Sequence, residues 1–392
     1  MFRARQRLVG LTASLTLALM ASVVGGAATS AFAGQAIDPI ITGSINPSPT
    51  LAISPQGSAA FKQALAVLVG GDQKSAYQLA AALPDPLERR TIQWAAIYYG
   101  NGSIDFGSVA RFAQDAPEFA SEALYKTRLE QSLVSSSPSG DDVIKLLGGA
   151  VPNTIKGQVL LAAAYNQAGQ TDKAARLARS IWTENALDAD TEKFVVTTLG
   201  KLLTHDDYWA RTVYLLMNDR ATGAGRMVSK LSAPQKSLAL AGIAVAANAS
   251  NASALLGKVD PSLRSSPLYL FMAAQNARGN GNFTSALNYL NAAKGPLPEA
   301  ALWWFERRTL IRLMLATGNA KLAYKAAATY TSGPEGRLVE ARFHAGWIAL
   351  AFLDDAKDAK PQFQKMLTLS TLPDSVTQGN YWLGRTLASL GD

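Results

Sequence analysis

The chain has 392 residues, of which 48% are hydrophobic and only 17% are charged, so it is long enough for a large buried core or an extended repeat array. It contains no cysteine, which excludes disulfides, thiolate nucleophiles, cysteine-based metal sites and a lipid-anchored cysteine. The formal net charge of +8 is moderate for this length and the basic residues form no dense run, so nucleic-acid binding is not expected.

Residues 1–33 have the pattern of a secretory signal peptide. Arginines precede an apolar run over residues 8–24, and an Ala-Phe-Ala cleavage pattern ends at Ala33. The alternative is an uncleaved membrane anchor, but the apolar run is at the short end for a spanning helix. The sequence therefore predicts export, which in a bacterium places the chain in the periplasm, with no membrane span after cleavage. Residues 34–57 are rich in Pro, Gly and Ser and are predicted to be a flexible linker.

From Ser58 onward the pattern is helical. Apolar residues recur every three or four positions, and no stretch shows the alternation and β-branched enrichment of a strand. Residues 154–182 read as a clear helical hairpin, and the alanine-rich residues 233–247 as a helix buried on several sides. A Gly-containing turn is predicted at residues 221–225, where we expect an internal joint.

A turn signal, in which a turn residue precedes an alanine by five positions, recurs at Gly71, Gly169, Gly281, Gly318 and Asp354. From Gly281 the signal repeats at intervals of 36 or 37 residues, as far as Gly391. A glycine just past a helix end can take the left-handed conformation that reverses the chain, and the alanine lets two helices approach closely. The period is longer than the ~34 residues of a tetratricopeptide repeat (TPR). Residues 58–392 are therefore predicted to form an all-α, right-handed superhelix (a solenoid) of antiparallel, TPR-like helix hairpins.

Several strings carry a resemblance to a known family. WWFERR, LATGNAKLAYKAAA, HAGWIAL and YWLGRTLASLGD occur in this order and look like the late superhelical region of soluble lytic murein transglycosylases. DPLERRTIQW at Asp85 resembles the early helices of that family, and DDYWARTVYLLMNDRATGAGRMVSKL at Asp206 resembles its middle. The resemblance covers roughly residues 55–392 and is a pattern over the whole length.

The resemblance implies a function in the cell wall. The family cleaves peptidoglycan glycan strands between N-acetylmuramic acid and N-acetylglucosamine, leaving a 1,6-anhydro end. Its catalytic glutamate lies in a lysozyme-like domain after the superhelix, in a Glu-Ser pair followed by a Gly-Leu-Met-Gln segment, and neither string occurs here. By resemblance, the chain is the superhelical U-shaped region that positions glycan strands for a catalytic domain missing from this chain, and it is inactive alone. The implied partners are glycan strands, with a C-terminal catalytic domain or periplasmic proteins.

The residues themselves offer little chemistry. Glu306 is the most tempting acid, but a helix-surface carboxylate neutralised by Arg307 and Arg308 is the favoured interpretation. Glu340 and His344 are four residues apart and could present two metal ligands, yet a structural zinc site needs four, so a packed histidine is favoured. There is no GxSxG elbow, P-loop, GxGxxG or HExxH motif. No catalytic residue, metal site or cofactor is predicted.

Trp303 and Trp304 are the candidate glycan contacts, because flat aromatic rings pack on pyranose faces. Packing in the core is the alternative and is favoured for Trp347 and Trp382. Adjacent residues on a helix cannot both face one side, so one of the first pair is expected to line an accessible surface.

A second hypothesis has no glycan role. Helical solenoids commonly bind other proteins and a fold does not fix a function, so the chain is alternatively a stand-alone periplasmic adaptor.

Overall fold

A computed structural model describes residues 57–391 with the exception of residue 121. The predicted signal peptide (residues 1–33) lies outside the described residues, as does the predicted linker up to residue 56. Residues 57–392 form a single unit. Every regular element in the described part is a helix, and none of these helices combines the length and apolar character needed to cross a lipid bilayer.

The α-helices of the first half are α1 (Ala59–Val69), α2 (Gln73–Ala81), α3 (Pro86–Tyr99), α4 (Phe106–Asp115), α5 (Glu122–Ser135), α6 (Gly140–Leu147), α7 (Ile155–Gln167), α8 (Thr171–Glu184), α9 (Ala189–Leu199) and α10 (His205–Met217). Those of the second half are α11 (Ala221–Met227), α12 (Ala233–Ala246), α13 (Ala252–Gly257), α14 (Pro267–Gly279), α15 (Phe283–Ala292), α16 (Ala300–Ala316), α17 (Ala320–Ala328), α18 (Glu335–Phe352), α19 (Ala356–Leu369) and α20 (Pro373–Leu390). Short 3-10 turns occur at Pro117–Phe119, Gly200–Leu202, Val228–Lys230 and Pro261–Leu263.

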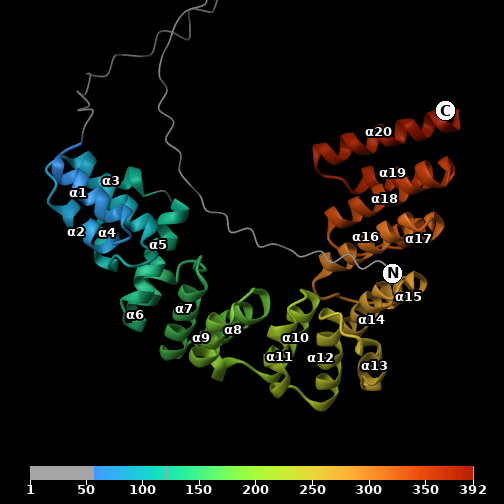
Figure 1. Cartoon of the computed structure of the whole chain (residues 1–392), viewed down its shortest axis with the longest axis horizontal. Coiled ribbons are helices and arrows are strands. Elements are labelled where there is room, and N and C mark those ends of the chain that lie inside the picture. Colours follow the sequence, from blue (N-terminus) through green and yellow to red (C-terminus); the bar gives the residue numbers. More distant parts are fainter. Residues whose placement is uncertain (1–56, 121, 392) are drawn as a thin grey trace, which may run out of the picture. The chain divides into compact units, whose positions relative to one another are not determined.

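Consecutive helices pair as hairpins, and each hairpin packs on the next (Figure 1). Helix α7 packs on α8, α14 on α15 and α18 on α19. The first helices of successive hairpins also touch, in the series α10, α12, α14, α16 and α18. Because the main contacts join elements that are close in sequence, the predicted all-α solenoid of TPR-like hairpins is confirmed.

One turn geometry recurs through the stack. The second residue past the first helix of a hairpin has a positive φ, between 49 and 91°, at Gly71, Gly169, Asp219, Asn248, Gly281, Gly318 and Asp354. In six of these turns the next N–H donates to the carbonyl five residues earlier, which closes the helix end as a Schellman motif. The turns predicted from the glycine register are confirmed, and Asp219 and Asn248 supply two more. The predicted alanines are all fully buried: Ala76, Ala174, Ala286, Ala323 and Ala359.

The turn predicted at residues 221–225 is wrong. These residues lie in helix α11, and the chain reverses earlier, at Asp219. Gly223 is buried, and a Cβ there would come within 3.0 Å of the Leu215 side chain. The glycine therefore allows close packing of α11 on α10, and residues 57–392 are not divided at this point.

Buried arginines join successive hairpins. Arg211 on α10 is completely buried and donates to the carbonyls of Trp182 and Asn185, at the end of α8. Arg342 on α18 donates in the same way to the carbonyl of Ala328, at the end of α17. Helix C-termini leave carbonyl groups unpaired and carry a partial negative charge, so a guanidinium satisfies both at once.

Candidate binding site

The two tryptophans predicted to contact glycan are both buried. Trp303 is 1% exposed, stands edge-on to Phe271 with ring centroids 5.2 Å apart, and donates its indole N–H to the carbonyl of Pro298. Trp304 is 0% exposed, and its ring centroid is 5.4 Å from that of Tyr330. Neither ring is accessible to a sugar, so the expectation that one of them lines an open surface is corrected. Both belong to the core between hairpins.

Glu306 is also placed differently from the expectation of a surface carboxylate neutralised by its sequence neighbours. It is 5% exposed, and the guanidinium of Arg278 on α14 binds both of its oxygens, with Nε–Oε1 and Nη2–Oε2 distances of 2.5 and 3.1 Å. Burial raises the pKa of Glu306, and the Arg278 charge opposes that shift. Arg307 and Arg308 do not bind this carboxylate and instead reach α17 and α18. The carboxylate thus links α14 to α16.

Glu340 and His344 do not form a metal site. The Glu340 carboxylate accepts hydrogen bonds from Arg308 at 2.7 Å and from Arg337 at 3.2 Å. The Nδ1 of His344 donates to the carbonyl oxygen of Glu340 at 2.8 Å, and burial lowers the pKa of this imidazole, which favours its neutral form. No group of three or more potential metal ligands occurs among the described residues. The favoured reading of a packed histidine is confirmed, since the ring lies edge-on to Trp304.

An accessible tryptophan lies elsewhere, on α10. Trp209 is partly exposed and borders a cavity of about 380 Å³, a size typical of small-ligand sites. The cavity is mainly apolar; Thr183 and Ser266 also line it, and their hydroxyls donate to the carbonyls of Arg179 and Leu263. Its walls come from α10, the start of α14 and the segment before α16, and include Trp209, Val213, Pro267, Leu268, Pro298 and Glu299.

Glu299 gives this cavity its one carboxylate. The residue has a φ of 49° at the start of α16, and its Oε2 lies 3.3 Å from the amide nitrogen of Asn218. An indole ring beside a carboxylate matches the two sides of a sugar, whose ring C–H groups are apolar and whose hydroxyls donate hydrogen bonds. Trp209 was missed in the sequence because nothing in a helical pattern separates a half-covered ring from a buried one.

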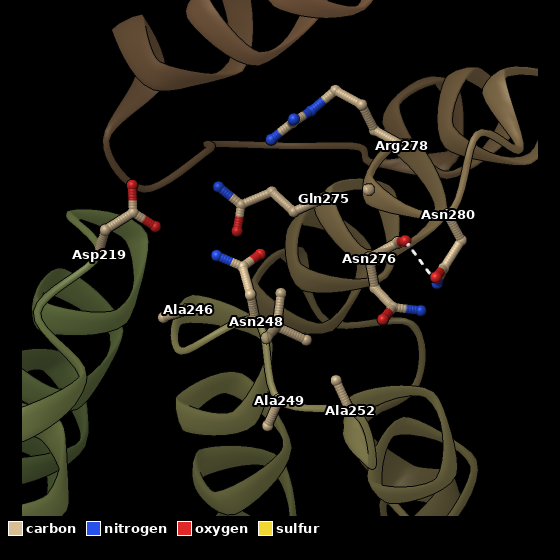
Figure 2. Close-up of a pocket in the computed structure, with 11 residues that line it drawn as sticks. Asp219, Ala246, Asn248, Ala249, Ala252, Gln275, Asn276, Arg278 and Asn280 are labelled. Carbon is tan, nitrogen blue, oxygen red and sulfur yellow. Dashed lines mark hydrogen bonds between the residues drawn. The ribbon is translucent and has the colours of Figure 1, made fainter. Parts of the chain in front are cut away.

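A second, polar cavity of about 490 Å³ lies at the far end of α14 (Figure 2). In Figure 2 a carboxylate from the turn after α10, an amide from the turn after α12 and side chains from the last turns of α14 converge on it. The polar residues that line it are Asp219, Asn248, Gln275, Asn276, Arg278 and Asn280. The Arg278 guanidinium is paired with the Glu306 carboxylate, so these two charges neutralise each other. The Asp219 carboxylate is then the remaining charge that lines this cavity.

Comparisons with known proteins yield only distant structural similarities. No family model and no curated protein matches the chain. Among solved structures, yeast Tom70 aligns over 85% of this chain and 89% of its own length, with 13% identity and a TM-score of 0.33. The APC/C hetero-tetramer Cut9-Hcn1 aligns over 84% of this chain and 63% of its own length, with 12% identity and a TM-score of 0.31. Likenesses this distant carry no argument about function.

Proposed function

We propose that this chain is the superhelical, peptidoglycan-binding region of a soluble lytic murein transglycosylase, exported to the periplasm. The sequence resemblance supports the family, and the helix hairpins found where the resembling strings occur agree with it. The observation that supports glycan binding is the Trp209 cavity, which pairs a partly exposed aromatic ring with the Glu299 carboxylate.

Binding would work by stacking and hydrogen bonding. The indole of Trp209 packs on the C–H face of a sugar ring while Glu299 accepts hydrogen bonds from hydroxyls. A net charge of +8 adds a long-range attraction for the anionic wall polymer. The role is to hold and position a strand, because the buried acid Glu306 is bound on both oxygens by Arg278 and cannot deliver a proton to a substrate.

The test is co-sedimentation with insoluble peptidoglycan. We expect the wild-type chain to sediment and Trp209→Ala to bind at least about tenfold more weakly, since truncating a contact tryptophan costs ~2 kcal/mol. Trp347→Ala removes another partly exposed tryptophan, whose ring stands edge-on to Phe352 of its own helix; this variant is the matched control and should bind normally. Far-UV circular dichroism checks that each variant is folded.

Two results would count against the proposal. Equal sedimentation of wild type and a folded Trp209→Ala variant would remove the cavity from the binding surface. Failure of the wild type to sediment would overturn the glycan function and leave the protein-binding adaptor, for which a pull-down from periplasmic extract is the direct measurement.

A further inference from the structure

Three hairpin turns carry a side chain where glycine would be the natural choice. At the positive-φ position the stack has glycine in four turns, but Asp219, Asn248 and Asp354 in the others, with φ values of 56, 49 and 52°. Residues with a Cβ are strained in this conformation, and Asn and Asp tolerate it better than other side chains. Persistent strain is a reason to look for a function of the side chain involved.

Two of these three side chains meet in one place. Asp219 and Asn248 both line the polar cavity at the end of α14, and in Figure 2 their carboxylate and amide point into it together with Gln275. Among the described residues, none makes a hydrogen bond or ion pair with the Asp219 carboxylate or the Asn248 side-chain amide. Their hydrogen-bonding capacity is therefore available to a ligand.

The charge and hydrogen-bonding groups of the cavity select the ligand. An Asp219 carboxylate without a cationic partner disfavours anions and accepts hydrogen bonds from hydroxyl groups. The amide of Asn248 offers both a donor and an acceptor, the complement of another amide, while Gln275 also donates to Glu306 and keeps its amide oxygen as an acceptor. A neutral saccharide that carries acetamido groups meets both requirements.

We propose that this cavity is a subsite for an N-acetylated sugar of the glycan, with Asp219 accepting hydroxyl hydrogens and Asn248 and Gln275 pairing with the acetamido group. The proposal rests on the proposed glycan function and adds a second, polar contact site for the strand. The Trp209 cavity borders the start of α14 at Pro267, and this one borders its end at Asn280.

The test uses substitutions that keep the turn and remove the side chain. Asp219→Gly and Asn248→Gly place the preferred residue at a positive φ, so the hairpins should fold with an equal or higher midpoint temperature. Isothermal titration with tri-N-acetylchitotriose should then give about tenfold weaker binding for Asp219→Gly, as expected when a charge-assisted hydrogen bond is lost. Asp354→Gly relieves the same strain outside the cavity and should change the melting temperature but not the affinity.

A second probe tests recognition of the acetamido group. Cellotriose, which lacks that group, should bind the wild type more weakly than chitotriose, and Asn248→Gly should narrow the difference. Equal chitotriose affinity in the wild type and the Asp219→Gly/Asn248→Gly double variant would overturn the subsite. If peptidoglycan sedimentation still depends on Trp209 in that case, the glycan function stands and the subsite alone fails. If the wild type binds neither peptidoglycan nor chitotriose, both proposals fail.

Discussion

A close approach between helices α18 and α19 gives a sharp test of how the hairpins are packed. Gly346 on α18 is buried, and a Cβ at this position would lie 2.7–2.8 Å from three ring atoms of Phe363 on α19. The Phe363 ring is 0% exposed and stacks on Trp382, so it has little room to move. Overpacking of this kind costs ~1–3 kcal/mol, whereas replacing glycine by alanine inside a helix gains ~1 kcal/mol. We therefore expect Gly346→Ala to lower the free energy of unfolding by about 1 kcal/mol.

A matched glycine separates packing from helix propensity. Gly384 lies inside α20 with no atom within 4 Å of its would-be Cβ, so Gly384→Ala should raise stability by about 1 kcal/mol. The two variants should thus differ by ~2 kcal/mol in urea unfolding followed by circular dichroism, with hydrogen exchange of α18 and α19 localising the loss. Phe363→Leu should recover part of the loss in the Gly346→Ala background. Gly346→Ala as stable as Gly384→Ala would refute the close packing of α18 on α19.

Two further predictions concern polar groups. Arg307 is 4% exposed, and burial lowers its pKa to about 10. Its guanidinium donates to two acceptors at the end of α17 and to Asn291 of α15, so Arg307→Lys should cost ~2 kcal/mol in urea unfolding. Arg312→Lys, on the exposed face of α16, should change stability by less than ~0.5 kcal/mol. A cost for Arg307→Lys no larger than that for Arg312→Lys would contradict a stabilising role of these three hydrogen bonds. Hydrogen bonds from backbone N–H groups lower the pKa values of the N-cap residues Asp72 and Asp188 in the folded chain. The unfolded chain therefore binds more protons in acid. The stability that the two carboxylates add is present above their unfolded pKa values and is lost as the pH falls through the lower folded values. Asparagine at position 188 keeps the capping acceptor but does not titrate, so the melting temperature of Asp188→Asn should fall less between pH 5 and pH 2.5 than that of the wild type. An equal fall would show that Asp188 does not contribute to the acid sensitivity.

The spacing of turn residues and alanines shows which parts of the fold could be predicted from the sequence. Glycine followed by alanine five positions later predicted the hairpins correctly, because the glycine takes the left-handed conformation at the turn and the alanine lets the two helices approach closely. The same spacing exists at Asp219, where Ala224 is fully buried, and it was missed because aspartate is not a turn marker as strong as glycine. The turn was predicted at residues 221–225 because of Gly223, which lies within helix α11. Asn and Asp tolerate positive φ, so including them in the register would have found the turn at Asp219. The turn at Asn248 would still have been missed, because Ser253 and not an alanine lies five positions after it.

The tryptophan assignments failed because accessibility in a solenoid is set by neighbouring hairpins, which a helical pattern does not contain. On an isolated amphipathic helix, adjacent residues cannot share the buried face, and one of Trp303 and Trp304 had to be exposed. Helix α16 is instead covered on two flanks: Trp303 meets Phe271 of the preceding hairpin, and Trp304 meets His344 of the following one. Trp209 also lies within a helical pattern, but it stays partly accessible because Pro267 and Leu268 border its cavity without filling it. Which aromatic residues of such a chain can meet a ligand thus depends on contacts between repeats, and the Trp209→Ala and Trp347→Ala pair measures that dependence directly.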